Sequence, residues 1–421
     1  MVDECIVLVR DNAALAKLCG ISVLERLLRT LQRCGIKRVT ILSSTPELLA
    51  DYASRRPWPR AELEITIRKS EHVMAEEIVG AWPDRARSLL VVRADTIFDT
   101  RLLRLLVDQK SNAALVDLAV TQEIAPLVVS APNASRGKFC GAALLERDWC
   151  AAQSGVFEKA VLNGLERGDI VALDVADQSL YDVALRRKLR PFWFFAPSKS
   201  NTAAAEQLLL NATQKGALDI PALFHGPIEK FLISKLCRTA ITPNQLTIFC
   251  NIIAWGATIL FATGHLATGI LVALIVGVLD GLDGRLARVK IETTKRGKLE
   301  HWFDAIFEWS WWTALAYYFQ TAGRLPGAFN YWLLLLAAEA IDGIAKGVVY
   351  FRTGKTIDEL NTFERMVRLI GGRRNVYVWI LAIGVLLHAP EKAFIVMAWL
   401  EAATAVVHLP HAAWIFFQKR K

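Results

Sequence analysis

The sequence has no Cys-x-x-Cys pair, and its seven cysteines are odd in number. This pattern indicates neither a zinc site of paired cysteines nor a disulfide framework, so a reducing compartment is expected. The first five residues contain two acids and no basic residue. We therefore expect no signal peptide before the first half of the chain, which should remain in the cytoplasm.

Charged residues make up only 22% of the 421 residues, whereas hydrophobic residues make up 53%. This balance fits neither a disordered chain nor a uniformly soluble enzyme, and it predicts membrane segments. The net charge of +9 suits nucleic acid or an anionic membrane surface. Long apolar runs favour the membrane, so no nucleic-acid partner is expected.

The sequence predicts two domains. Residues 1–197 alternate β-branched runs with amphipathic stretches such as Val23–Cys34, which is typical of a Rossmann-like α/β domain. Residues 198–222 are expected to form a linker helix, and 223–240 an interfacial helix on the membrane, although an ordinary tether has the same pattern. Residues 241–421 are expected to form a membrane domain. The β-branched runs are Ile6–Val9, Val39–Leu42, Leu89–Val92 and Ala114–Val120.

Six apolar blocks predict a six-helix transmembrane bundle, since each approaches the roughly 20 residues that cross a bilayer core. The blocks are 241–262, 266–287, 300–321, 328–351, 374–389 and 392–417. Six Lys and Arg residues lie from Arg285 to Lys298 and six from Arg352 to Arg374, whereas the loops on the other side contain only Arg324 and Lys392. The positive-inside rule therefore predicts a multi-pass protein with a cytoplasmic N-terminal domain and C-terminus.

Four acids lie at the cytoplasmic ends of two consecutive predicted spans. Asp280 and Asp283 are at i and i+3, and Glu300 and Asp304 at i and i+4, so each pair shares one helix face. Clustered carboxylates repel one another unless a cation lies among them, and the sequence gives no cationic partner for Asp280 or Asp283. Oxygen ligands suit Mg²⁺ or Mn²⁺ together with substrate phosphates.

Small residues follow the same helix face. Gly281, Gly284 and Ala287 recur at three-residue intervals, which permits close approach of a ligand to the backbone. Such spacing more often packs helices against one another. Arg288 follows and is suited to bind phosphate, or else to anchor the helix at the cytoplasmic surface.

These residues resemble the signature of the CDP-alcohol phosphotransferase family, D-x-x-D-G-x-x-A-R-x8-G-x3-D-x3-D. The match in type and spacing covers the string from Asp280 to Arg288 and then Gly297, and Arg238–Thr247 resembles the family's entry into its first membrane helix. In strict spacing the third and fourth acids would fall at His301 and Ala305.

The local sequence offers two registers for these acids. One deletes a residue after Leu299 and makes Glu300 the third acid and Asp304 the fourth, which we prefer. The other uses Asp304 and Glu308.

The resemblance implies a membrane transferase that passes a phosphoryl-alcohol group from a CDP-alcohol to a hydroxyl acceptor and releases CMP. It implies that Mg²⁺ or Mn²⁺ is held by four acids, which are Asp280, Asp283, Glu300 and Asp304. Asp304 would also act as the general base. Gly281, Gly284, Ala287 and Arg288 would contact substrate. The alcohol and the acceptor stay open between lipid and polyol phosphate, and the oligomeric state stays open between monomer and homodimer.

Other polar residues occur in or beside the later spans. Arg373 and Arg374, with Arg365 and Arg368, are expected either to bind the acceptor phosphate or an anionic lipid, or simply to signal topology. Asp342 and Lys346, at i and i+4, are expected to pair within the bundle. His408 and His411 flank Pro410 and are expected at the membrane interface. Neither histidine has a spacing that requires metal.

The first domain resembles sugar-nucleotide and inositol-phosphate nucleotidyltransferases in Leu18–Leu42, in Val91–Asp99 with Asp95 as the metal-binding acid, and in Leu173–Leu180 with Asp174. Those enzymes open with a glycine-rich loop and a lysine that bind a triphosphate, whereas here no glycine precedes Gly20. Without this loop a triphosphate lacks its backbone amide donors. We therefore expect a degenerate domain that is regulatory or structural.

The arrangement of both halves resembles the family of fused inositol-1-phosphate cytidylyltransferases and di-inositol-phosphate-phosphate synthases, with the first activity lost. A competing hypothesis is a membrane scaffold that is non-catalytic in both halves.

Overall fold

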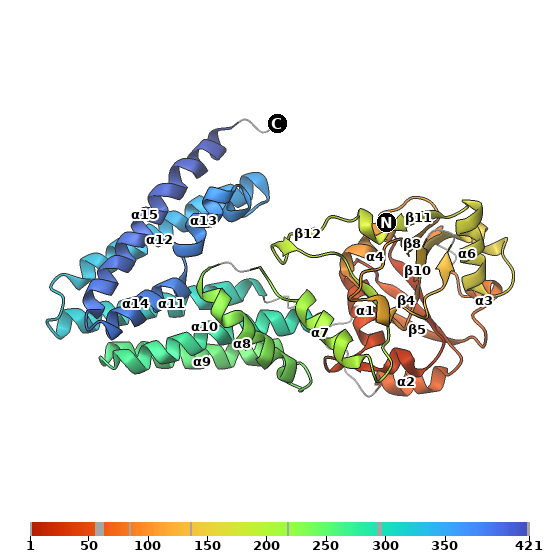
Figure 1. Cartoon of the computed structure of the whole chain (residues 1–421), viewed down its shortest axis with the longest axis horizontal. Helices are drawn as coiled ribbons and strands as arrows, with labels where there is room; N and C mark the ends of the chain where they lie inside the picture. Colours follow the sequence, from red (N-terminus) through yellow and green to blue (C-terminus); the bar gives the residue numbers. More distant parts are fainter. Residues whose placement is uncertain are drawn as a thin grey trace. The chain divides into compact units, whose positions relative to one another are not determined.

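A computed structural model of the chain describes residues 2–54, 63–83, 86–134, 137–216, 219–292 and 297–418, and does not describe the side chains of 52–54 and 297–304. The chain forms two compact units (Figure 1). The first contains Met1–Lys215 and Arg288–Glu292, and the second contains Gly216–Ala287 and Thr293–Lys421.

The first unit is built on a mixed sheet with the order β11-β8-β10-β6-β1-β4-β5, in which β9 also pairs with β10. Strand β1 is parallel to β4 and β6, whereas β10 is antiparallel to β6 and β8. These strands are β1 (Glu4–Val9), β4 (Arg38–Ser43), β5 (Glu64–Lys69), β6 (Ser88–Arg93), β8 (Ala113–Asp117), β9 (Asn133–Ala134), β10 (Gly137–Glu146) and β11 (Val171–Asp174). The predicted α/β class is confirmed.

Short two-stranded pairs complete the strands of this unit: β2 (Lys17–Leu18) with β3 (Ile21–Ser22), β7 (Thr96–Phe98) with β14 (Trp193–Phe195), and β12 (Tyr181–Asp182) with β13 (Arg187–Lys188). One predicted boundary is wrong, because the strand expected over Ala114–Val120 ends at Asp117. The Asp117 carboxylate accepts a hydrogen bond from the Ala119 amide at 3.2 Å, which turns the chain away from the sheet.

Helices cover both faces of the sheet. Figure 1 shows α1 and α4 on one face and α3 and α6 on the other. Helix α1 begins where Ser22 Oγ accepts a hydrogen bond from the Glu25 amide at 3.0 Å, which is an N-cap. The helices are α1 (Val23–Arg33), α2 (Pro46–Ser54), α3 (Ala75–Gly80), α4 (Thr100–Val107), α5 (Arg147–Ala151), α6 (Phe157–Arg167) and α7 (Thr202–Ala212).

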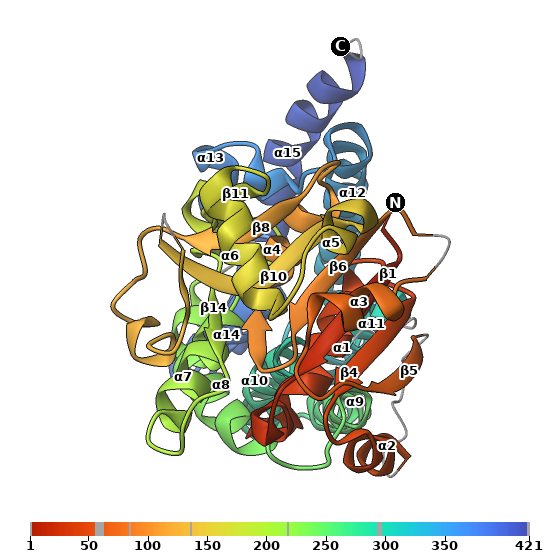
Figure 2. The same cartoon turned by 90° about the vertical axis from the view of Figure 1, so that its right-hand side faces the viewer.

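The second unit is helical (Figure 1 and Figure 2). Its helices are α8 (Pro221–Leu236), α9 (Pro243–Ala262), α10 (Leu266–Val289), α11 (Gly297–Thr321), α12 (Ala328–Thr353), α13 (Thr362–Ile370), α14 (Arg374–Leu386) and α15 (Pro390–Phe417). Thr242 and Gln245 cap α9 reciprocally, and Pro243 occupies its first position, which explains why this motif begins the first span.

Several of these helices are apolar enough to cross a membrane. Within the described residues, α9, α10 and α15 are each long and apolar enough to span a bilayer, and so are α13 and α14 taken together as a pair bent by 45°. The predicted span 374–389 is thus the second half of a broken helix. Helices α11 and α12 have 25 and 26 residues but contain acids, so the count of six spans stays a prediction.

The outer faces of these helices support a membrane location. On α9, large apolar side chains are exposed, and they are Ile248, Phe249, Ile252, Trp255 and Ile259. The inward faces bury a core of aromatic rings around Trp311, Trp312 and Phe261. Apolar residues on both sides of a helix are typical of a segment that faces lipid outside and protein inside.

Helix α7 belongs to the α/β unit, although the sequence suggests a linker. Leu209 and Leu210 are buried, and Glu206 Oε1 accepts a hydrogen bond from the Cys19 amide at 2.9 Å. We expect Met1–Lys215 to melt at a higher temperature than Met1–Pro197, because each buried leucine contributes roughly 1.5–3 kcal/mol. Circular dichroism during heating measures the difference.

Single substitutions provide the control for this prediction. Leu209→Ala in Met1–Lys215 should reproduce most of the loss, whereas Leu208→Ala, at a half-buried position, should lower the melting temperature less. Equal melting temperatures for the two segments would mean that α7 does not stabilise the domain.

Candidate functional site

The two acids of the signature lie on α10 and have different surroundings. Asp283 is buried, with 4% of its surface exposed, and accepts a hydrogen bond from Thr247 Oγ1 of α9 at 2.6 Å. Asp280 is one turn earlier, and its Oδ2 lies 2.7 Å from Arg374 Nη2. The expectation that Asp280 has no cationic partner is wrong, because Arg374 is 94 residues away in sequence and only the fold brings it near.

The small residues of α10 have separate neighbours. A Cβ on Gly281 would lie 2.5 Å from Glu229 Oε1 of α8, so this glycine permits close packing of α8 against α10. Gly284 and Ala287 are half-buried. Arg288, in the first unit, donates from Nε to the Thr213 carbonyl at 2.9 Å. The contact of these four residues with substrate stays a prediction.

The predicted third and fourth acids lie in the first turns of α11. The backbone of this helix is described from Gly297, but the side chains of Glu300 and Asp304 lie outside the described residues. In the part of the chain that is described, no three His, Cys, Asp or Glu side chains are arranged to hold a metal ion. Because half of the predicted four-acid cluster lies outside that part, this finding does not test the cluster.

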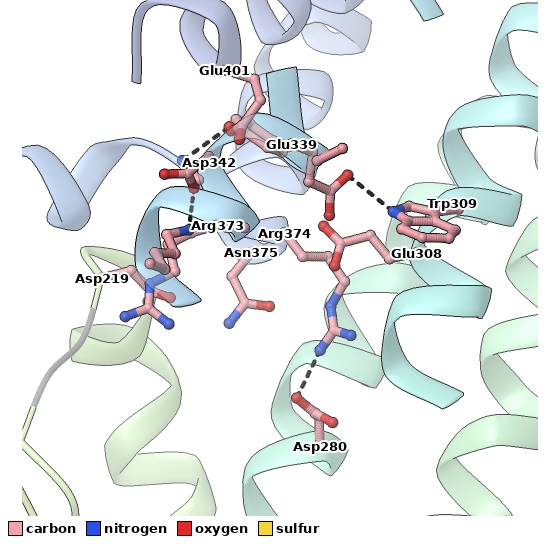
Figure 3. Close-up of a pocket in the computed structure, with 15 residues that line it drawn as sticks. Asp219, Asp280, Glu308, Trp309, Glu339, Asp342, Arg373, Arg374, Asn375 and Glu401 are labelled. Carbon is pink, nitrogen blue, oxygen red and sulfur yellow. Dashed lines mark hydrogen bonds and ion pairs between the residues drawn. The ribbon is translucent and has the colours of Figure 1, made fainter. Parts of the chain in front are cut away.

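A cavity of about 520 Å³ adjoins Asp280 within the helical unit. Figure 3 shows the side chain of Arg374 beside Glu308, with its guanidinium group pointing toward Asp280. Helices α10, α11, α12, α14 and α15 all contribute to its wall. The lining residues are Asp219, Asp280, Glu308, Trp309, Glu339, Ala340, Asp342, Gly343, Lys346, Gly372, Arg373, Arg374, Asn375, Tyr377 and Glu401.

Most of this lining is ionisable or can form hydrogen bonds. Glu339 Oε2 accepts a hydrogen bond from Trp309 Nε1 at 3.2 Å, and Tyr377 donates to Glu401. Glu401 is fully buried, and in the described part of the chain no hydrogen-bond donor contacts its Oε1. A buried carboxylate oxygen without a donor is costly unless a ligand or water satisfies it.

The sequence placed Arg373 and Arg374 in the site and offered Glu308 only as an alternative metal ligand, whereas Glu339 and Glu401 were missed. The available signal for these two was the rarity of acids inside apolar helices. Asp342 does pair with Lys346, as predicted. His408 is fully buried rather than interfacial, because its Nδ1 lies 2.5 Å from Asp342 Oδ1 inside the bundle.

The predicted metal-binding acid of the α/β unit, Asp95, lies in a group of ion pairs. Arg10, in the chain after β1, lies 2.8 Å from Glu158. Arg93 lies 2.9 Å from Glu158 and binds both oxygens of Asp95, at 3.0 and 2.6 Å. Burial opposes the charge of Arg93, but Asp95 and Glu158 outweigh that effect, so the pKa of its guanidinium is raised. The negative charge of Asp95 is thus compensated by the guanidinium group of Arg93.

The second predicted acid of this unit also has protein partners. Asp174 Oδ1 accepts from the Leu118 and Ala176 amides at 3.2 and 3.1 Å, which is the geometry of an N-cap. We name Arg10, Glu158, Arg93 and Asp95 the N-terminal ion-pair network.

Comparison with known proteins finds a relative that spans most of the chain. A curated protein of Rubrobacter xylanophilus, "Bifunctional IPC transferase and DIPP synthase", is 25% identical over 430 residues that cover 94% of this chain and 91% of that protein.

Two solved structures each resemble one part of the chain. The inositol-1-phosphate CTP transferase from T. maritima has a TM-score of 0.36 and 10% identity, and the match covers 49% of this chain and 96% of that one. The phosphatidylinositol phosphate synthase of Mycobacterium tuberculosis, with CDP-DAG bound, has a TM-score of 0.36 and 21% identity, and the match covers 46% and 94%.

A family model covers the segment that contains the signature, the buried His408 and every residue of the cavity lining except Asp219. It is the model of the CDP-alcohol phosphatidyltransferases, and it matches residues 240–408. The resemblance seen in the spacing from Asp280 to Arg288 is confirmed by this match. Residues 240–408, in the helical part of the chain, therefore match the CDP-alcohol phosphatidyltransferase family.

Proposed function

We propose that the helical unit transfers a phosphoryl-alcohol group from a CDP-alcohol to the hydroxyl of a small polar acceptor and releases CMP. The observation that carries this proposal is the cavity beside Asp280, which joins the family's acidic helix to two arginines and several acids. The expected orientation places the cytoplasmic ends of these helices where the soluble nucleotide is available.

The lining of the cavity favours a polyol phosphate as the acceptor. Arg373 and Arg374 can bind a phosphate through planar guanidinium groups. Glu308, Glu339 and Glu401 offer carboxylate oxygens that accept hydrogen bonds from hydroxyl groups. A diacylglycerol chain would leave these groups desolvated and unpaired. The family relative named as a DIPP synthase is consistent with an acceptor of this class.

The donor set of the proposed metal site fits Mg²⁺ or Mn²⁺. Asp280, Asp283, Glu300 and Asp304 supply carboxylate oxygens from two successive helices, and hard divalent cations prefer such oxygens. A bound cation would neutralise charge on the pyrophosphate and on the departing CMP. Thr247 holds the Asp283 carboxylate in one orientation, and Arg374 offsets the charge of Asp280.

Proton transfer from the acceptor requires a base, and Asp304 is the residue that we propose for it. We assign it as the general base that takes the proton of the acceptor hydroxyl while that oxygen bonds to the phosphorus carrying the alcohol. The bond from this phosphorus to the CMP oxygen then breaks, and CMP leaves with the electron pair. To act as a base, Asp304 would have to be unprotonated near neutral pH, which requires that a metal offset the charge of the neighbouring acids.

We propose that the α/β unit does not make CDP-alcohol itself. Its support is the missing phosphate loop before Gly20 and the N-terminal ion-pair network, which occupies Asp95 with Arg93. A separate cytidylyl-transfer reaction must then supply the donor.

Thr247→Val should lower the rate of CMP release by about 10–100-fold, because partners that orient metal-binding carboxylates typically matter by that factor. The rate is measured with radiolabelled CDP-alcohol over a series of Mg²⁺ concentrations, and the variant should need more Mg²⁺. Thr263→Val, at the other end of α9, should behave as wild type. Identical Mg²⁺ dependence in Thr247→Val and wild type would argue against a metal at Asp283.

The register of the acids on α11 predicts different effects for two substitutions. Glu300→Gln should abolish Mg²⁺-dependent CMP release, because it removes a metal ligand. Glu308→Gln should keep the Mg²⁺ dependence and raise the acceptor KM, because Glu308 lines the cavity. The reverse pattern would show that Asp304 and Glu308 are the third and fourth acids.

The full chain should release no pyrophosphate from CTP with inositol phosphate or glycerol phosphate and Mg²⁺. The reason is that the chain lacks the loop whose backbone amides would bind the triphosphate of CTP. A coupled pyrophosphate assay measures this. Asp95→Asn should leave CMP release by the helical unit unchanged. Pyrophosphate formation that depends on Asp95 would make the chain bifunctional.

A further inference from the structure

The two cavity arginines follow a sharp break between α13 and α14. These helices are bent by 45° at the break, which contains Gly371, Gly372 and Arg373 before α14 begins at Arg374. Gly372 has φ +62, and a Cβ there would lie 2.9 Å from Asp342 Oδ2. A Cβ on Gly371 would lie 2.1 Å from Thr404 Oγ1 of α15. The break therefore packs directly on α12 and α15, and only glycine fits.

Hydrogen bonds fix the backbone of the break from both sides. Arg368 Nη1 donates to the Gly372 carbonyl at 3.0 Å, and the Gly372 amide donates to Tyr377 Oη at 3.0 Å. Tyr377 in turn donates to Glu401. The position of Arg373 and Arg374 thus depends on where α13 and α15 hold the chain.

A buried acid joins α13 to α15. Glu364, with 2% exposure, lies between two histidines of α15: its Oε1 is 2.5 Å from His411 Nδ1, and its Oε2 is 3.2 Å from His408 Nε2, without the alignment of a hydrogen bond. His408 Nδ1 is 2.5 Å from Asp342 of α12. We name Glu364, His408, His411 and Asp342 the histidine clamp, because it connects three helices.

We propose that the histidine clamp positions Arg373 and Arg374 for the acceptor phosphate, with Glu364 as its central positioning residue. This inference rests on the proposed function. Glu364 does not line the cavity, so it acts through the α13–α14 break and the arginine that follows. Displacement of α13 would shift Arg374 relative to Asp280, which it contacts at 2.7 Å.

The clamp predicts an effect on acceptor binding and not on donor binding. Glu364→Gln keeps the size of the side chain and removes its charge, and it should raise the acceptor KM about tenfold, which is the effect of losing one charge-assisted contact. The KM for the CDP-alcohol should change less than twofold. Glu364→Asp should restore part of the acceptor affinity. Glu359→Gln, in the short helix η4 (Ile357–Glu359) that precedes α13, is the matched control and should behave as wild type.

A substitution cycle tests whether Glu364 acts through the two arginines. In a background that carries both Arg373→Lys and Arg374→Lys, Glu364→Gln should change the acceptor KM less than twofold, since the groups that it positions have been replaced. Equal, additive effects in both backgrounds, or a parallel rise in both KM values, would overturn the proposal and leave the clamp a packing element. If Glu364→Gln fails to fold, His411→Gln, whose histidine side chain is 22% exposed, takes its place with His388→Gln as the control. Absence of CMP release from wild type would instead refute the proposed function.

Discussion

The helical unit depends on one constraint, which is that carboxylates buried among apolar helices need partners. An isolated buried charge is strongly unfavourable because it has lost its hydration. Removing one member of a buried ion pair therefore leaves the other as an uncompensated buried charge. Buried Asp342 has Lys346 and His408, buried Asp283 has Thr247, and half-buried Asp280 has Arg374. Each pairing joins groups on different helices or turns, so the same contacts that satisfy the charges also fix the helices around the cavity.

The two units use charge in opposite ways. In the helical unit the ionisable groups surround a cavity of about 520 Å³, so charge remains available to a ligand. In the α/β unit Arg10, Arg93, Asp95 and Glu158 contact one another. The first arrangement suits recognition of a polar substrate, whereas the second uses its charges for internal structure.

Local patterns in the sequence predict much of this structure. Alternation predicts the parallel strands around β1, the spacing from Asp280 to Arg288 predicts one face of α10, and the i, i+4 spacing predicts the pairing of Asp342 with Lys346. The contacts that sequence reasoning missed are distant in the chain. Arg374 and Asp280 are 94 residues apart, and His408 and Asp342 are 66 apart. No local period encodes such a pair, because only the packing of α12, α14 and α15 brings them together.

The N-terminal ion-pair network constrains how its four residues can change. Arg93 binds both Asp95 and Glu158, and Arg10 binds Glu158. Substituting Arg93 alone would leave Asp95 and Glu158 without their shared cation, and substituting Glu158 alone would leave two arginines facing each other. Single substitutions in the network are therefore each unfavourable, so its residues are expected to change together and not one at a time.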